Sequence, residues 1–243
     1  MIILFSDFGL HGPYIGQVKA VLSERAPTHV VIDLFADAPM FNIRCSAYLL
    51  AAYIQGFPKD SVFCAVVDPG VGSSEREPVI LSANGYWFVG PDNGLFACVA
   101  ASDPVSRCWK ISWKPEHISA TFHGRDIFAP VAAMLANGEP PSGVLYPQAQ
   151  TLNCDWPDNY PAAIYIDHFG NVMTGLKADT VAESAVLIVA GTQLKFARTY
   201  NDVAQGQGFW YRNANGLVEI AIACGDAAKS YGIRVNDPVA MTT

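Results

Sequence analysis

Hydrophobic residues in the first half of the chain form short runs that alternate with segments of helical spacing. The strand-like runs and helical segments are, in order, residues 2–5, 14–23, 30–35, 42–55 and 62–67, with a further helix at 126–137. Within 42–55, apolar residues recur on one helix face, which indicates packing against a sheet. Strands that alternate with helices predict an α/β domain with a central, mostly parallel sheet.

The pattern changes after Gly138, which is expected to end the last of these helices. Prolines are frequent between residues 139 and 161, and few apolar positions there are periodic, so we place a domain boundary between residues 150 and 151. Beyond it the apolar segments are short, rich in β-branched and aromatic residues, and separated by Gly, Asn and Asp. The sequence therefore predicts an α/β domain at 1–150 and a small all-β domain at 151–243.

Composition excludes several classes of protein. Of 243 residues, 51% are hydrophobic and 15% charged, which is far from the profile of a disordered chain. The net charge is −7 and no segment concentrates Lys or Arg, so we expect no nucleic-acid partner. The longest apolar run, residues 47–54, is too short to span a bilayer, and the first ten residues lack a basic leader pattern. We expect a cytoplasmic protein with no membrane partner.

Local signatures narrow the chemistry further. The six cysteines are widely spaced without a CxxC pair, which favours free, buried thiols. The sequence contains no GxGxxG, GxxxxGK[ST], GxSxG or HExxH motif. Dinucleotide-binding, P-loop, serine-hydrolase and zincin interpretations therefore lose their main support.

Three apolar strand-like runs lead directly into an aspartate, at Asp7, Asp68 and Asp92. Ligands of open α/β sheets bind outside the carboxyl ends of the strands, so these carboxylates are candidates for one crevice. Taken singly, each is better explained as a turn former or helix N-cap. The three together favour a site.

Three further segments carry candidate chemistry. The loop 68–76 holds a proline and two glycines and could form an anion-binding nest, or be a tight loop in which Arg76 pairs with Glu75. A metal site could combine His123 with Asp7, Asp68 and Asp126, although no ligand spacing requires it. In segment 167–171, a carboxylate, an aromatic ring and an amide suit a purine, and a hairpin turn explains them equally well.

Taken together, these segments resemble the S-adenosyl-L-methionine hydroxide adenosyltransferases, relatives of fluorinase and chlorinase. The resemblance spans nearly the whole chain and rests on six ordered blocks, SDFG with a following Tyr-x-Gly-x-x-Lys, VVDPGVG with a downstream Arg, GPDNG, FHGRD, DHFGN and a late Glu-Ile-Ala. It implies a barrel-like C-terminal domain and a homotrimer with sites between subunits. It also implies hydrolysis of S-adenosyl-L-methionine to adenosine and L-methionine, by attack of water or hydroxide at ribose C5′, without metal or added cofactor.

The resemblance also assigns site residues. Asp68, Arg76 and His123 match the catalytic Asp-Arg-His set. The substrate-binding positions would be Asp7 for the ribose hydroxyls, Phe41 and Phe122 beside the reacting carbon, Asp167 for the methionine ammonium, and Phe169, Asn171 and Tyr200 for adenine, with Asn215 as a further substrate-binding position. Three features depart from the family pattern, namely Gly12, Ala214 and one extra residue before Arg76.

Related halogenases share the scaffold, and two positions distinguish this chain from them. Val71 occupies the halide-loop position, and Gly124 stands where a halide-holding serine would be. Asp68 would also repel a halide. Hydrolysis is therefore the expected activity. The alternatives are a halogenase, a metal-dependent hydrolase, or a non-catalytic protein that binds S-adenosyl-L-methionine or adenosine.

Overall fold

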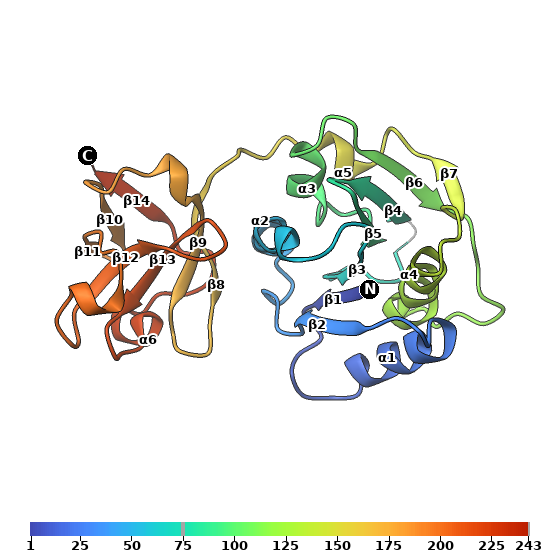
Figure 1. Ribbon diagram of the computed structural model, residues 1–243, viewed down its shortest axis with the longest axis horizontal. Coiled ribbons are helices and arrows are strands. Elements are labelled where there is room, and N and C mark those ends of the chain that lie inside the picture. The colour runs from blue at the N-terminus through green and yellow to red at the C-terminus, as the bar shows by residue number, and fades with distance from the viewer. Residues whose placement is uncertain (74–75, 243) are drawn as a thin grey trace. The chain divides into compact units, whose positions relative to one another are not determined.

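The computed structural model describes residues 1–73 and 76–242. The chain divides into two compact units, Met1–Trp156 and Pro157–Thr243 (Figure 1). Each unit has its own core of buried apolar side chains. The division falls six residues after the boundary expected from the sequence, because α5 (Gln150–Asn153) is tied to the first unit by hydrogen bonds from its first backbone N–H groups to Asp92.

The first unit is built on a seven-stranded sheet with the order β2-β1-β3-β5-β4-β6-β7. Strands β2, β1, β3 and β5 run parallel, whereas β4, β6 and β7 extend the sheet in antiparallel pairs. The strands are β1 (Ile2–Ser6), β2 (Val31–Phe35), β3 (Val62–Val66), β4 (Pro78–Ala83), β5 (Tyr86–Pro91), β6 (Arg107–Ile111) and β7 (Gly143–Leu145). The expected sheet with parallel central strands is confirmed.

Helices cover both faces of this sheet (Figure 1). Side chains alternate along β1, so Ile2 and Leu4 pack with α1 and α4 on one face. Asn42 starts α2 by accepting a hydrogen bond from the N–H of Cys45. The helical elements are α1 (Tyr14–Arg25), α2 (Ile43–Tyr53), η1 (Ile54–Gly56), α3 (Ala97–Ala101), η2 (Gly124–Phe128), α4 (Ala129–Ala136) and α5. The helix expected at 126–137 is thus a π-helical turn, η2, that continues into α4.

The second unit consists of two antiparallel sheets around one core. Isolated bridges join the sheets on both sides, Ala162 to Pro238 and Phe196 to Trp210, which makes the unit barrel-like. The four-stranded sheet has the order β12-β13-β9-β8, and the three-stranded sheet the order β11-β10-β14. Its elements are β8 (Tyr160–Ile166), β9 (Val172–Lys177), η3 (Ala178–Thr180), β10 (Val186–Val189), β11 (Thr192–Leu194), η4 (Tyr200–Asp202), β12 (Gly208–Arg212), β13 (Leu217–Ile222), α6 (Ala227–Tyr231) and β14 (Val239–Thr242).

Two general expectations can be compared with the described residues. All six cysteines are free thiols, three of them buried, and burial raises the pKa of Cys64 and Cys108 to about 12. No helix among residues 1–73 and 76–242 has both the length and the apolar character needed to cross a lipid bilayer.

Candidate active site

All three strand-end aspartates follow parallel strands of the sheet, and Asp7 and Asp68 follow two strands that are neighbours. Strands β1 and β3 are neighbours with Ser6 paired to Val66, so Asp7, directly after β1, and Asp68, two residues after β3, lie at the same edge. Burial raises the pKa of the Asp7 carboxyl, and the negative charge of Asp68 raises it further. The carboxyl ends of the two strands therefore bring together a pair of interacting acids.

Asp68 is held by an arginine from the loop that it begins. Its Oδ1 accepts a hydrogen bond from Arg76 Nη1 at 3.0 Å and another from the N–H of Gly70 at 3.2 Å. The Asp68 side chain is 7% exposed and that of Arg76 33%, so this ion pair is largely withdrawn from solvent. Glu75, the other expected partner of Arg76, lies outside the described residues.

The backbone around Gly70 explains how the arginine reaches the carboxylate. A Cβ atom at residue 70 would lie 2.5 Å from Arg76 Nη1 and 2.7 Å from its Cζ, distances that real Cβ contacts do not show. The guanidinium therefore lies against the glycine backbone. Only glycine allows this approach at residue 70.

Asp7 fixes Phe41, which the resemblance places beside the reacting carbon. The N–H of Phe41 donates to Asp7 Oδ2 at 3.0 Å. Phe41 adopts a φ of 59°, a left-handed conformation that is costly for a bulky residue, and its side chain is 67% exposed. The hydrogen bond to Asp7 helps to hold this backbone and keeps the ring outside the core.

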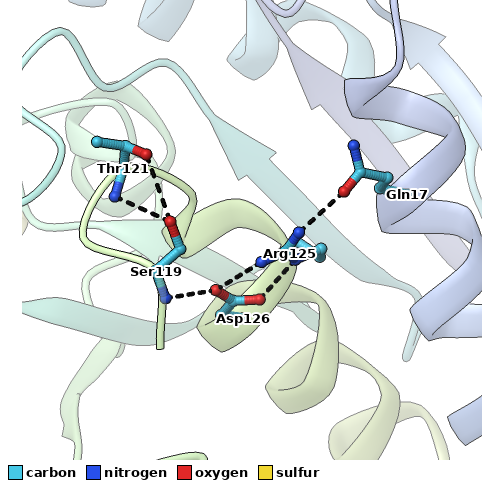
Figure 2. A network of polar contacts seen from close by, with 5 residues as sticks. All are labelled: Gln17, Ser119, Thr121, Arg125 and Asp126. Carbon is cyan, nitrogen blue, oxygen red and sulfur yellow. Dashed lines mark hydrogen bonds and ion pairs between the residues drawn. The ribbon is translucent and has the colours of Figure 1, made fainter. Parts of the chain in front are cut away.

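The segment with Phe122 and His123 is locked by the polar network in Figure 2. Arg125 donates to both oxygens of Asp126, from Nε at 2.6 Å and from Nη2 at 3.0 Å. Asp126 Oδ2 also accepts from the N–H of Ser119 at 2.7 Å, which closes the segment 119–126 into a loop. Arg125 Nη1 donates to Gln17 of α1 at 2.9 Å. These contacts tie the loop to α1, which packs against the sheet.

Aromatic rings complete this part of the site. The Phe122 ring meets those of Phe8 and Tyr14 edge-on, with centroids 5.9 and 5.4 Å apart, and the Arg125 guanidinium lies over it at 5.0 Å. A Cβ at Gly124 would lie 2.9 Å from the Phe8 ring. The space beside Gly124 is therefore filled by Phe8.

His123 is half-buried and directly precedes η2. Among the described residues, no hydrogen bond or ion pair joins it to Asp68, whose Oδ1 is instead occupied by Arg76 and Gly70. The hydrogen bond from Arg125 lowers the pKa of Asp126, and the positive form of His123 adds a smaller effect in the same direction. His123 thus lies within the loop 119–126, and its contacts in the described residues include no hydrogen bond or ion pair to Asp68.

The third aspartate, Asp92, directly follows β5, the other parallel neighbour of β3, and its carboxylate is engaged by backbone N–H groups. It is buried, and its two oxygens accept hydrogen bonds at 2.8 Å from the N–H groups of Gln150 and Thr151. The next residue, Asn93, is also buried and donates to the carbonyl of Val67 at 2.9 Å. The GPDNG block therefore builds the support behind Asp68.

The described residues also bear on the metal interpretation. They contain no group of three or more His, Cys, Asp or Glu side chains arranged to hold a metal ion. Asp126, one of the four proposed ligands, is committed to Arg125 and Ser119. The geometry of these side chains does not favour a metal centre.

In the second unit, the segment 167–171 forms the hairpin turn between β8 and β9. Asp167 accepts hydrogen bonds from the N–H groups of Phe169 and Asn171 and from Asn171 Nδ2, at 2.8 to 2.9 Å. Asn171 is buried, whereas the Phe169 side chain is 73% exposed. Asp167 and Gly170 also line an open surface pocket of about 360 Å³, bounded on its other side by residues of α6 and Arg234. The turn thus has both the hairpin role and a ligand-sized space beside it.

Tyr200, the other residue assigned to adenine, lies near this turn. Asp167 and Asn171 are both close enough to influence the pKa of its hydroxyl, which burial raises. The Tyr200 hydroxyl is 3.1 Å from that of Tyr211, which in turn donates to Glu219. Asn215 lies apart, in an exposed turn, where its N–H donates to Asn213 Oδ1 at 2.9 Å.

Sequence reasoning did not identify Tyr211, Asn213 or Glu219 as members of this cluster. Glu219 is 3% exposed, and burial raises the pKa of its carboxyl, as does the charge of Asp167, while hydrogen bonds from Tyr211 and Asn213 act in the opposite direction. A single carboxylate within the apolar run LVEIAI was the available signal.

Comparison with known proteins identifies the family. The model of the SAM hydroxide adenosyltransferase N-terminal domain matches residues 2–144, and that of the C-terminal domain matches residues 162–240. Proteins named (R)-S-adenosyl-L-methionine hydrolase from Thermus thermophilus and Salinispora arenicola are 38% and 35% identical, each over 98% of this chain and over 98% and 95% of their own lengths.

Solved structures agree with this result. An uncharacterized conserved protein from Thermotoga maritima superposes with a TM-score of 0.90 at 31% identity, with both chains fully covered. A conserved hypothetical protein from Thermus thermophilus gives a TM-score of 0.79 at 35% identity, with 99% of both chains covered. This chain belongs to the SAM hydroxide adenosyltransferase family.

Proposed function

We propose that this chain hydrolyses S-adenosyl-L-methionine to adenosine and L-methionine, with water or hydroxide attacking ribose C5′. The observation that carries the proposal is the withdrawn Asp68–Arg76 pair at the sheet edge next to Asp7. Its support is the membership of the family and the name (R)-S-adenosyl-L-methionine hydrolase given to relatives that align over nearly the whole chain.

The chemistry places most of the demand on the nucleophile. The sulfonium group leaves as a neutral thioether, so little acid catalysis is required. Formation of hydroxide at pH 7 from water with a pKa of 15.7 costs about 12 kcal/mol, at 1.36 kcal/mol per pKa unit. The site must therefore stabilise a hydroxide-like oxygen or remove a proton during the attack.

We assign these two tasks to different side chains. Arg76 stabilises the negative oxygen electrostatically, because Asp68 and the Gly70 backbone fix its guanidinium. His123 accepts the proton, because its loop is held by Asp126 and Arg125. Asp68 acts in this scheme by orienting Arg76.

The remaining residues would position the substrate. Asp7 would accept hydrogen bonds from the ribose hydroxyls, with Phe41 and Phe122 beside the reacting carbon. In the second unit, Phe169, Asn171 and Tyr200 would hold adenine, and Asp167 and Asn215 would meet the methionine end. Asp167 is preorganised for this task, because three hydrogen bonds already fix its carboxylate. In-line alignment would supply much of the rate.

The structure gives the halogenase alternative no support. A serine at position 124 would place its Cβ 2.9 Å from the Phe8 ring, so the ring would have to move before a hydroxyl could hold a halide there. The proposed reaction needs no metal and no added cofactor, since Arg76 and His123 provide the charge and the proton acceptor.

We also propose the homotrimer that the resemblance implies, and a cytoplasmic location. Support for the trimer is the membership of the family, for which the resemblance implies sites between subunits. Sedimentation equilibrium would test it. Support for a reducing compartment is that all six cysteines are free.

The decisive experiment supplies each sulfonium epimer of the substrate to metal-stripped protein in ¹⁸O-labelled water. Mass spectrometry should find ¹⁸O in adenosine at C5′, with the (R) epimer consumed and a His123→Ala variant much slower. Binding without product would replace hydrolysis with a sensor role. Activity restored only by added metal would establish a metal-dependent hydrolase, and a halogenated nucleoside formed from chloride would establish a halogenase.

A further inference from the structure

Glu219 is a buried carboxylate at the centre of the four-stranded sheet. It lies in the middle of β13, directly across from Tyr211 on β12 and Met173 on β9, and all six residues of β13 are buried. An ionised group in such a place costs free energy unless its oxygens are hydrogen-bonded, and an apolar residue would pack there without this cost. The hydrogen-bond partners of Glu219 show what the carboxylate does there.

One oxygen of Glu219 starts a chain of hydroxyl groups. Tyr211 donates its hydroxyl proton to Oε1 of Glu219. A tyrosine hydroxyl has one proton, so Tyr211 must accept at its 3.1 Å contact with Tyr200, and Tyr200 must be the donor. As the acceptor at the end of this chain, Glu219 thereby fixes the rotation of the Tyr200 hydroxyl and leaves only lone pairs on its outer side.

The Tyr200 ring is fixed by packing as well. It meets the rings of Phe209 and Tyr211 edge-on, with centroids 5.2 and 5.5 Å apart. Tyr200 lies in η4, a single short turn whose start is capped by Thr199, and 41% of the tyrosine is exposed. The hydrogen-bonded chain from Glu219 is therefore one polar restraint on a ring that otherwise faces outward, beside the hydrogen bond between Tyr200 and Asn171.

The second oxygen of Glu219 acts on a different segment. Asn213 Nδ2 donates to Oε2 at 2.8 Å, while Asn213 Oδ1 accepts from the N–H groups of Asn215 and Leu217, both at 2.9 Å. The carboxylate thus selects one of the two orientations of the Asn213 amide. In that orientation the amide oxygen closes the turn that presents Asn215.

We propose that Glu219 is a positioning residue that aligns both ends of the substrate site in the second unit, Tyr200 through Tyr211 and Asn215 through Asn213. The inference rests on the proposed function, in which Tyr200 holds adenine and Asn215 meets the methionine end. The two sets of hydrogen bonds, or branches, start from different oxygens of one carboxylate. A substitution at Tyr211 or at Asn213 therefore removes one set without removing the other.

The experiment uses the full-length chain and three variants, Tyr211→Phe, Asn213→Ala and Glu219→Gln. Glutamine matches the shape of Glu219 but presents an N–H₂ group to one of two donors, Tyr211 or Asn213, so one branch must break or rotate. Glu183→Gln, at an exposed glutamate of the same unit, is the matched control. Dissociation constants for adenosine come from calorimetry, and inhibition constants for L-methionine, KM and kcat from turnover assays.

We expect Tyr211→Phe to weaken adenosine binding about tenfold, the effect of losing one hydrogen bond that ends on a carboxylate. Inhibition by L-methionine should not change. Asn213→Ala should weaken inhibition by L-methionine about tenfold and leave adenosine binding unchanged. Glu219→Gln should weaken the ligand of the branch that its N–H₂ group faces, and should raise KM far more than it lowers kcat. Glu183→Gln should resemble the wild type.

Equal weakening of both ligands in the two branch variants, in step with a lower melting temperature, would show a merely structural role and overturn the inference. Unchanged ligand affinities in all three variants would do so too. A wild-type protein that binds adenosine but forms none from S-adenosyl-L-methionine would refute the proposed function alone. In that case adenosine affinity still decides the Tyr211 branch.

Discussion

The Arg76 guanidinium lies against the backbone of Gly70, so close that a single added methyl group at residue 70 would come within 2.5 Å of Nη1. The same guanidinium donates to Asp68 Oδ1 at 3.0 Å. The direction of the arginine is therefore set by the absence of a side chain two residues after the aspartate. A substitution at residue 70 can therefore displace the guanidinium while Asp68 and Arg76 both remain in the chain.

Gly70→Ala should lower kcat by about a hundredfold, because a displacement of about 1 Å in a group that stabilises the reacting oxygen has this effect. The fold should survive, since Gly70 does not have a positive φ and the obstructing atoms belong to a flexible side chain. Turnover of S-adenosyl-L-methionine and a thermal melt measure the two quantities.

Gly56→Ala is the matched control, because nothing lies within 4 Å of the Cβ it adds. It should retain wild-type kcat. If Gly70→Ala also did so, Arg76 would not need its present position and its assigned role would be wrong.

Arg125→Lys should lower kcat by about tenfold or more with a smaller change in KM. Lysine keeps the charge but loses the two-point contact with Asp126 and the simultaneous contact with Gln17, so the loop that carries His123 loosens. The exposed Arg198 offers an Arg→Lys control. Equal kinetics in the two variants would mean that the network of Figure 2 does not position His123.

Asp7→Asn should stabilise the folded protein at pH 7 while lowering activity by about tenfold, the effect of losing a charged hydrogen-bond acceptor. Burial and Asp68 raise the pKa of Asp7 above its ordinary value of 3.8, so the ionised carboxylate is less favourable in the folded state than in the unfolded one. The amide oxygen of asparagine can still accept from Phe41.

The sign of the pH dependence follows from this shift. The folded state binds more protons than the unfolded state between pH 3.8 and the raised pKa, so the contribution of Asp7 to stability falls as pH rises through that window. Melting temperatures at about pH 3.5 and pH 7 should therefore show a gain for Asp7→Asn only at pH 7. A gain of equal size at both values would contradict the shift.

Asp92→Ala should reduce the free energy of unfolding by about 2–3 kcal/mol, because one buried and one partly buried N–H group lose their acceptor. The kcat of the protein that remains folded should be unchanged, in contrast to Asp68→Ala. Chemical denaturation and active-site titration separate the two effects, with the exposed Asp155→Ala as control. A large loss of kcat in a fully folded Asp92→Ala protein would show that Asp92 takes part in catalysis.

The difference between Asp68 and Asp92 shows where sequence reasoning succeeds and where it stops. Both follow an apolar run, and the runs themselves were sufficient to predict the parallel strands. The role of Asp92 depends on Gln150 and Thr151, which are 58 and 59 residues away. No local pattern contains that contact.

Other features of the sequence carried structural information that was not drawn from them. Asn84-Gly85 is a two-residue hairpin signal, and both residues adopt the positive φ that such a turn requires, 54° and 74°. It would have predicted the antiparallel pairing of β4 with β5. Similarly, the Glu in LVEIAI marked a buried polar cluster, although only the fold shows that Tyr211 and Asn213 are its partners.

The backbone of Phe41 has a consequence for laboratory evolution. A left-handed φ of 59° penalises phenylalanine by roughly 1–2 kcal/mol relative to glycine, and the exposed ring recovers little of this by packing. A library selected only for heat resistance should therefore accumulate glycine at this position, whereas one selected for turnover should retain the ring. The amino acid at position 41 would then distinguish the two selections, with glycine favoured by thermal stability and phenylalanine by catalysis.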